Sequence, residues 1–560
     1  MIKHKERSIM NTTYTYDHYY VYDEITSVLK KYVSDYPGYC RLSSIGETSE
    51  GRRIWMMEVT DLSTGDFEDK PGFALDGNVH AGEVTGSMAC MYFLDTLFTN
   101  KDEKEIADIL KQYTVYCVPR ISPDGSEYYL TTADSLRSVN KMYPFEELQA
   151  GIQPADIDGD GVIRLMRMKN PHGVFKISQQ DPRIMVKREP DEVSGEFYDV
   201  FREGYVEKPE KLQELKPAAE KFGNDFNRNL AAGWGIGGRG GAYAFSNPKT
   251  YAFANFLFAH KNICSCLNFH TYAGAYLYPP AMKGRSEVSA ADMKRYKEIG
   301  ELIKEETGYP FVNLHDEFLD GRSVGGSLDD FEHYVLGFLG MTCECWDIDA
   351  RCGKEMKFPM KPETDEEMLK YYDMLFDWMQ KNDLMDFWKD WTPFDHPELG
   401  WVETGGFDTK HLMQNPPVKF LHEEVEKHTK FMLREIKLLP RLAVSVKTEK
   451  AGDYHKVDVT VANHAYLPTY ITDEGKKMIQ LKPVKVEVSG CEVIEGKEVQ
   501  EIGQLNGFAL TGNPGWGLGA STMNHEPSRK VLHYLVKGDS FTVKAGSPRS
   551  GVKTLTVTLD

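Results

Sequence analysis

Apolar residues occur along the chain with different spacings, and these spacings predict different elements. Residues 22–36 carry apolar side chains three or four positions apart, as on one face of a helix, and Pro37-Gly38 ends the run. Largely apolar runs, typical of strands buried on both faces, occur at residues 72–79, 113–120, 263–269 and 338–346. Helices are expected between or after them, at about residues 83–98, 251–260 and 422–438. Strands alternating with helices predict an α/β domain with a parallel or mixed sheet.

Two other stretches do not follow this alternation. Residues 140–222 are rich in charged residues, proline and glycine, so we interpret them as a long insertion that decorates the sheet. After Pro440, apolar and polar residues alternate strictly in short runs separated by turn residues. This alternation predicts a small antiparallel β-sandwich. The expected domains are therefore a mixed-sheet α/β/α domain at residues 1–440 and a β-sandwich at residues 441–560.

Composition and charge restrict the kind of protein. Hydrophobic residues make up 41% of the 560 residues and charged residues 27%, which is typical of soluble globular proteins. The formal net charge is −19, so the chain as a whole does not attract nucleic acids or anionic membranes. No apolar run approaches the ~20 residues of a membrane span. The first 20 residues contain no apolar stretch like that of a secretory signal, so we expect a cytoplasmic protein. Its 9 cysteines, without a CxxC pair, are expected to be free buried thiols.

Candidate metal ligands lie where two predicted strands end. His80 and Glu83 are three residues apart after the run 72–79, and His270 follows the run 263–269. In a chain of this composition, about two pairs of a His and an acidic residue are expected at this spacing by chance. The pair is therefore informative because of its place at the end of a predicted strand. Open α/β sheets place their sites at the carboxyl ends of their strands. Imidazole and carboxylate are both zinc ligands, and a catalytic zinc needs three protein ligands and an open position.

Two further segments contain groups that zinc chemistry would use. Glu344 is a lone carboxylate in the apolar run 338–346, and strand alternation turns it away from Cys343 and Cys345. Since a buried carboxylate without a partner is costly, Glu344 is expected to be paired in a salt bridge, protonated, or functional, for example as a general base. Asn227 and Arg228 together match the geometry of a substrate carboxylate, although Asn–Arg pairs are also common on surfaces.

Seven motifs now identify a resemblance. The chain resembles the zinc carboxypeptidase family, of the pancreatic carboxypeptidase type, over about residues 20–440, as a bacterial-type member with a long insertion and a C-terminal β-sandwich. The motifs occur in the family's order: IGETSEGRRI (45–54), GNVHAGE (77–83), PRISPDG (119–125), DFNRN (225–229), NFHTYAG (268–274), GGSLDDF (325–331) and TCECWD (342–347).

The resemblance implies a role for each matching residue. One Zn²⁺ per chain would be held by His80, Glu83 and His270, with Glu344 as the general base. Asn227 and Arg228 would hold the terminal carboxylate of a peptide substrate. The family has an arginine about a dozen residues after its PDG motif that stabilises the oxyanion; here this is Arg137, with the alternatives Arg164 and Arg167. The implied activity is the release of C-terminal amino acids from peptides.

Departures from the family pattern leave alternatives open. Gly82 stands where many relatives have Arg, and residues 320–324 lack the tyrosine expected before the GGS motif, so that Tyr272 is a possible substitute. A cell-wall peptide amidase or acyl-amino-acid amidase on the same fold would use the same metal. A catalytically silent binding protein would have no reason to keep Glu344 buried. A purely structural zinc site is disfavoured because such sites are usually closed by four ligands and rich in Cys.

The insertion contains an acidic motif of its own. Asp156, Asp158 and Asp160, followed by Gly161, match the opening of a calcium-binding loop. The bidentate acid expected at position 12 is replaced by Arg167. The two interpretations are therefore a Ca²⁺ site at Asp156, Asp158 and Asp160, and an acidic turn whose carboxylates accept backbone N–H groups or pair with arginines.

Overall fold

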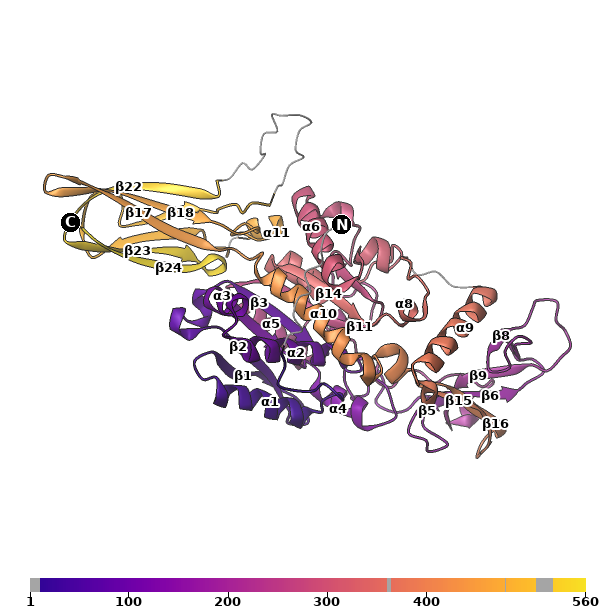
Figure 1. The fold of residues 1–560 in the computed structure, drawn as a ribbon. Coiled ribbons are helices and arrows are strands. Elements are labelled where there is room, and N and C mark those ends of the chain that lie inside the picture. The colour runs from indigo at the N-terminus through magenta and orange to yellow at the C-terminus, as the bar shows by residue number, and fades with distance from the viewer. Residues whose placement is uncertain (1–10, 360–363, 479, 510–526, 560) are drawn as a thin grey trace, which may run out of the picture.

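A computed structural model describes residues 11–359, 364–478, 480–509 and 527–559. Its centre is an eight-stranded sheet in the order β1-β2-β4-β3-β11-β14-β12-β13 (Figure 1). The strands are β1 (Cys40–Glu47), β2 (Arg53–Val59), β3 (Gly72–Gly77), β4 (Thr114–Val118), β11 (Ile263–Thr271), β12 (Ala275–Tyr278), β13 (Phe311–Asn313) and β14 (Leu339–Cys345). Neighbours among β4, β3, β11 and β14 are parallel, whereas β1, β2 and β12 introduce antiparallel pairs. The predicted mixed sheet is confirmed.

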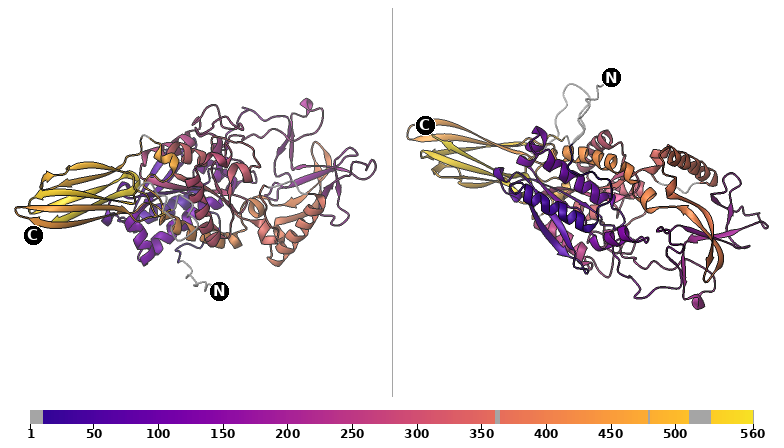
Figure 2. Two further views of the ribbon diagram at one scale, coloured as in Figure 1. Left: turned by 90° about the horizontal axis from the view of Figure 1, so that it is seen from above. Right: turned by 60° about the horizontal axis from the view of Figure 1, so that its bottom comes forward.

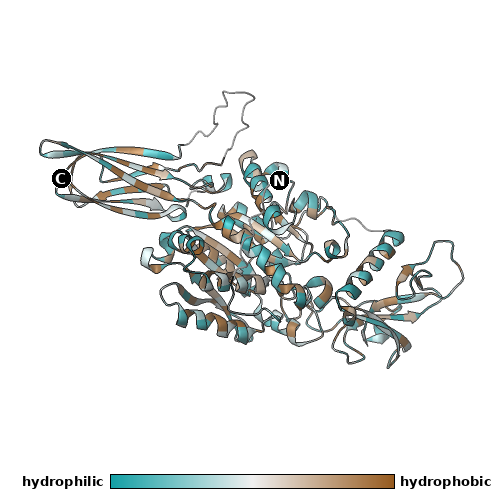
Figure 3. Ribbon diagram, viewed as in Figure 1, coloured by the Kyte–Doolittle hydropathy of each residue, from teal (hydrophilic) through white to brown (hydrophobic). Residues whose placement is uncertain are grey.

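Helices cover both faces of this sheet. On β4, Val115 and Cys117 belong to one hydrophobic cluster and Tyr116 and Val118 to another, as strand alternation requires. The first cluster contains residues of α1 (Tyr22–Asp35), α2 (Thr85–Thr99), α3 (Lys104–Gln112), α6 (Ala290–Thr307) and α10 (Val418–Ile436). The second contains residues of α5 (Pro248–Ala259). Figure 3 shows the hydrophobic residues concentrated in the central strands and on the helix faces turned toward them.

Residues 140–222, which we interpret as a long insertion that decorates the sheet, form strands that lie outside the eight-stranded sheet. They pair with residues 388–407 in a six-stranded sheet, in the order β15-β16-β6-β9-β7-β8, which we call the lobe together with the pair β10-β5. Its strands are β5 (Gly151–Pro154), β6 (Leu165–Lys169), β7 (Phe175–Ile177), β8 (Met185–Lys187), β9 (Tyr198–Arg202), β10 (Gly204–Glu207), β15 (Trp388–His396) and β16 (Gly400–Phe407). Helix α9 (Asp365–Lys381) packs against it, sharing a hydrophobic cluster that includes Phe376 and Phe407.

The C-terminal region is a β-sandwich, as predicted. Two four-stranded sheets enclose a cluster of valines and other apolar residues. Their strands are β17 (Leu442–Ala451), β18 (Tyr454–Asn463), β22 (Arg529–Lys537), β20 (Glu492–Glu495), β21 (Val499–Gly503), β19 (Val484–Ser489), β23 (Ser540–Ser547) and β24 (Gly551–Thr558). We propose a domain boundary near residue 440, because α10 ends at Ile436 and β17 begins at Leu442.

The sandwich lies at the opposite end of the molecule from the lobe (Figure 2). The buried Arg549 guanidinium donates to the backbone carbonyls of Leu336 and Gly337, just before β14 begins. Cys264, at the start of β11, donates to the carbonyl of Arg549. The sandwich therefore contacts the amino ends of the central strands. Among the helices in the described part of the chain, none combines the length and apolarity needed to cross a bilayer.

Candidate metal centre

The predicted ligands meet at the carboxyl ends of the parallel strands. His80 lies three residues beyond the end of β3, and His270 is the penultimate residue of β11. Glu344 on β14 is the register partner of His270. Glu83 lies in the turn before α2, where its N–H donates to the carbonyl of His80. This turn packs tightly: a Cβ on Gly77 would lie 2.6 Å from the backbone of Gly86, so only glycine fits there.

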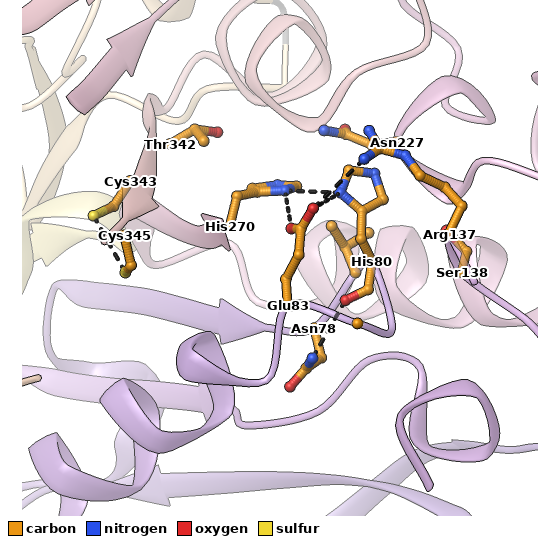
Figure 4. Close-up of polar contacts among 12 residues, drawn as sticks. Asn78, His80, Glu83, Arg137, Ser138, Asn227, His270, Thr342, Cys343 and Cys345 are labelled. Atoms are coloured by element: carbon orange, nitrogen blue, oxygen red, sulfur yellow. Dashed lines mark hydrogen bonds and ion pairs between the residues drawn. The ribbon is translucent and has the colours of Figure 1, made fainter. Parts of the chain in front are cut away.

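Three ligand atoms converge in a buried space (Figure 4). His80 Nδ1 lies 3.0 Å from Glu83 Oε1, and His270 Nδ1 lies 2.9 Å from Glu83 Oε2. The two Nδ1 atoms are 3.0 Å apart, and all three residues are buried. Two imidazole nitrogens and a carboxylate that point at one another present lone pairs that a cation would share. Nitrogen and oxygen donors of this kind fit zinc.

Asp225 fixes the orientation of His80. Its Oδ1 lies 3.1 Å from His80 Nε2, and its Oδ2 accepts a hydrogen bond of 3.1 Å from Arg137 Nε. A proton on Nε2, held by Asp225, leaves the lone pair on Nδ1, toward Glu83. Carboxylates that bind the outer nitrogen of a metal-ligating histidine orient it in the same way. Burial would raise the pKa of the Asp225 carboxyl, but Arg137 and His80 hold it well below its usual range. Sequence reasoning missed this role, although Asp225 opens the same DFNRN motif.

Arg137 is the predicted arginine that reaches the cluster. Its Nη1 lies 3.5 Å from Glu83 Oε1, and its side chain is 35% exposed, which leaves part of the guanidinium accessible. The two alternatives lie in the lobe, where Arg164 pairs with Asp160 and Arg167 pairs with Glu403. Arg137 is therefore the one of the three that lies beside the cluster of His80, Glu83 and His270.

Glu344 is half-buried, whereas Cys343 and Cys345 on either side of it are fully buried. The cysteines lie on the face covered by α10, with Cys343 Sγ 3.7 Å from His428 Nδ1, so Glu344 points to the other face as predicted. Burial, with the charge of Glu83 added, raises the pKa of Glu344 to about 8, while His270 and Arg137 act in the opposite direction.

The cluster of Cys343, Cys345 and His428 also brings three ligand atoms within 4.8 Å, but its geometry is not that of a metal site. Cys343 Sγ is 3.7 Å and 3.9 Å from the two ring nitrogens of His428, so the sulfur lies over the ring face. Both nitrogens already have partners, the Tyr276 hydroxyl at 2.9 Å and Glu424 Oε1 at 3.1 Å. We interpret this cluster as a hydrogen-bonded part of the core.

Glu424 supports the strand that carries Glu344. Its Oε1 accepts hydrogen bonds from the N–H of Trp346 (3.0 Å) and from the Tyr309 hydroxyl (2.6 Å). Trp346 has a φ of +71° and lies two residues beyond Glu344. Glu424 therefore holds the chain where β14 ends. The only sequence signal for this role is that Glu424 and His428 fall one turn apart on the buried face of α10.

Of the remaining predicted residues, Asn227 and Arg228 lie in a short 3-10 helix (Phe226–Arg228), and Tyr272 lies in the bend after β11. Asn227 Oδ1 accepts the N–H of Leu328, which joins the DFNRN and GGSLDDF motifs. The Arg228 guanidinium donates to the Asn227 carbonyl at 2.6 Å, and burial lowers the pKa of Arg228, although Asp225 opposes this. Tyr272, two residues after His270, is 51% exposed.

The departure at Gly82 has a steric explanation. A Cβ at this position would lie 2.8 Å from the Tyr129 ring and 3.1 Å from the Gln414 amide nitrogen. Tyr129 comes from α4 (Pro123–Thr131) and is fully buried. Any side chain at position 82, including the arginine that many relatives have there, would therefore clash with this ring.

The predicted calcium ligands are not brought together as a set. Asp156 accepts the N–H groups of Gly159, Asp160 and Gly161, and Asp160 pairs with Arg164 and Lys389. The Ca²⁺ site at Asp156, Asp158 and Asp160 is therefore unsupported, because Asp160 already has two cationic partners.

Comparisons with known proteins agree with the motifs. A family model described as "Zinc carboxypeptidase" matches residues 25–151 and 157–369, and a second one, of unknown function, matches residues 442–558. A zinc carboxypeptidase of Saccharothrix mutabilis subsp. capreolus is 30% identical over 143 residues, or 25% of this chain and 32% of that protein. Mouse carboxypeptidase D is 27% identical over 111 residues, or 20% of this chain and 8% of that protein. The matched segments thus span a third or less of these relatives.

Solved structures give weaker similarities. Thrombin-activatable fibrinolysis inhibitor matches with a TM-score of 0.40 and 18% identity, covering 67% of this chain and 78% of that one. Carboxypeptidase A of Helicoverpa armigera matches with a TM-score of 0.38 and 14% identity, covering 65% of this chain and 73% of that one.

Proposed function

Because the chain belongs to the zinc carboxypeptidase family, whose model matches more than half of it, we propose that it releases single amino acids from the C-terminus of peptides. Metal-dependent hydrolysis of peptide bonds follows from the family; the position of the cleaved bond is the proposal. The observation that supports hydrolysis at a metal is the convergence of His80, Glu83 and His270 at one strand edge, beside Glu344 and Arg137.

In this proposal His80, Glu83 and His270 hold one zinc ion. When bound, zinc acts as a Lewis acid on the scissile carbonyl and lowers the pKa of water at the site. Glu344, the register partner of the ligand His270, accepts the proton of the attacking water and passes it to the leaving amine. Arg137 donates N–H groups to the carbonyl oxygen as negative charge develops there.

The substrate end is chosen by Asn227 and Arg228. An arginine fork binds a carboxylate with two parallel hydrogen bonds, which gives orientation as well as affinity. Burial of Arg228 strengthens such a pair, because less water competes for the guanidinium. A peptide with a free C-terminal carboxylate is therefore the proposed partner, and positioning of this kind lowers the barrier by several kcal/mol.

Metal removal tests the proposal. A chelator should abolish peptide hydrolysis, and added Zn²⁺ should restore it at about one ion per chain. His80→Ala should fold but lose zinc, since it removes one of three ligands. A matched control is His260→Ala: His260, on the face covered by α5, contacts Phe256 and is not near the cluster. Zinc binding that persists undiminished in His80→Ala would refute the ligand assignment.

A further inference from the structure

An acidic cluster in the lobe combines two segments far apart in the sequence. Asp156 and Asp158 lie in the loop between β5 and β6, and Glu203 lies between β9 and β10. One carboxylate oxygen from each lies within 4.8 Å of the others. We call these three residues the lobe cluster. It replaces the trio suggested by the acidic motif, because Glu203 takes the place of Asp160.

Two carboxylate oxygens of the lobe cluster are buried and have no hydrogen-bond partner in the described part of the chain. They are Glu203 Oε2 and Asp158 Oδ1. Glu203 is only 1% exposed, and its other oxygen accepts the N–H of Arg164 at 2.6 Å. Asp158 Oδ2 accepts from Lys389 at 2.8 Å and from Thr404 at 2.6 Å. A buried carboxylate oxygen without a donor is unfavourable, which points to a missing positive partner.

The local charges lead to the same conclusion. Asp156, Asp158, Asp160 and Glu203 carry four negative charges if ionised. Among the described residues, their ion pairs come from two cationic side chains, Arg164 and Lys389. Two negative charges are left, which is the charge that one divalent cation neutralises. Burial, followed by the nearby aspartates, raises the pKa of Glu203 to about 7, in agreement with this excess.

We propose that the lobe cluster binds one hard divalent cation through Asp156, Asp158 and Glu203. Its donors are all oxygens, which suit Ca²⁺, Mg²⁺ or Mn²⁺, whereas zinc in proteins usually also takes nitrogen or sulfur ligands. Gly159 and Gly161 have φ of +76° and +88°, and the N–H groups of this turn donate to Asp156, which fixes its carboxylate within the loop. The site is separate from the metal centre and does not depend on the proposed function.

The ion would join the two segments of the lobe that meet here. It would connect the loop before β6 to the corner between β9 and β10. Arg202, next to Glu203, donates to the Ser135 hydroxyl at 3.3 Å, and Ser135 lies two residues before Arg137. The ion would therefore stabilise the lobe where it contacts the segment that carries Arg137.

Calorimetric titration of the full, zinc-loaded chain tests the proposal. Ca²⁺, Mg²⁺ and Mn²⁺ are added separately, and at least one should bind at about one ion per chain with a Kd of roughly 10⁻⁶–10⁻³ M. Glu203→Gln and Asp158→Asn should each weaken binding about 100-fold or more. Glu196→Gln is the matched control in the same lobe: Glu196 is exposed, pairs with Lys169 and should not affect binding.

Thermal unfolding distinguishes a lost site from a lost fold. Without the added ion, Glu203→Gln should be at least as stable as the wild type, because it removes a buried carboxyl with an unpaired oxygen. With the ion, the melting temperature should rise in the wild type and in Glu196→Gln but not in Glu203→Gln. Failure of all three ions to bind the wild type would overturn the proposal, as would equal binding to the wild type and Glu203→Gln.

Discussion

Glu344→Gln tests the proposed general base with little structural change. The amide has the size of the carboxyl but cannot accept a proton from water. Glu344 is half-buried and points to the face opposite Cys343, so the substitution should leave the packing against α10 intact. Zinc should still bind, because His80, Glu83 and His270 are unchanged.

The expected loss is large and falls on turnover. Positioned acid–base catalysis contributes about 10²–10⁴-fold, which is about 3–5 kcal/mol of barrier. The value of kcat should fall by this factor, while KM should change by less than about tenfold, because the carboxylate-binding residues are untouched.

The assay compares three proteins at equal zinc content, with hydrolysis of a peptide as the signal and thermal unfolding as the check on folding. The control is Glu435→Gln. Glu435 is fully buried and its pKa is also raised to about 8, but it lies on α10 and accepts a hydrogen bond from Ser265, away from the candidate metal centre. Glu435→Gln should keep full turnover. If Glu344→Gln, folded and zinc-loaded, also keeps near-normal turnover, then Glu344 is only a buried structural acid.

Three further predictions follow from individual contacts. Asp225→Asn should weaken zinc affinity by about 10–100-fold, measured by chelator competition, because His80 loses its charged partner; unchanged affinity would contradict this. Burial raises the folded-state pKa of Glu435 above its unfolded value, so the free energy of unfolding of the wild type should fall as pH rises from about 5 to 9. Glu435→Gln should lose less stability over this range. Parallel plots of unfolding free energy against pH for the two proteins would refute this prediction. Gly82→Ala should lower the melting temperature through contact with Tyr129, and this effect should shrink in a Tyr129→Ala background.

The strand ends made much of the metal centre predictable. His80 and His270 each follow a largely apolar run, and parallel strands place such positions at one edge. The period of two along β14 also predicted that Glu344 faces away from the cysteines. These inferences succeed because they depend on local periodicity and on one general rule of sheet topology.

The lobe and the supporting residues could not be predicted in this way. The strands formed by residues 140–222 are three to five residues long and mostly half-exposed, so they leave little apolar periodicity. Their partner β16 lies more than 200 residues later in the chain. Asp225 and Glu424 act only through tertiary contacts, with His80 and Trp346, and no local pattern distinguishes them from other acidic residues.

The central claim, that the enzyme acts at a free C-terminus, is tested most directly by comparing free and amidated forms of the same peptides. Loss of a charged hydrogen-bond partner costs about 1.5–3 kcal/mol, or roughly ten- to a hundredfold in kcat/KM. The wild type should therefore cleave amidated peptides at least about tenfold less efficiently. Arg228→Gln should show the same loss on free peptides and little further loss on amidated ones.

The matched control is Arg239→Gln, which removes a nearby guanidinium that is paired with Glu220. This variant should keep the preference for free peptides. Equal cleavage of free and amidated peptides by the wild type would contradict the account. Arg228 would then not bind the terminal carboxylate of the substrate, and the chain would be an amidase whose activity does not depend on the substrate's C-terminus.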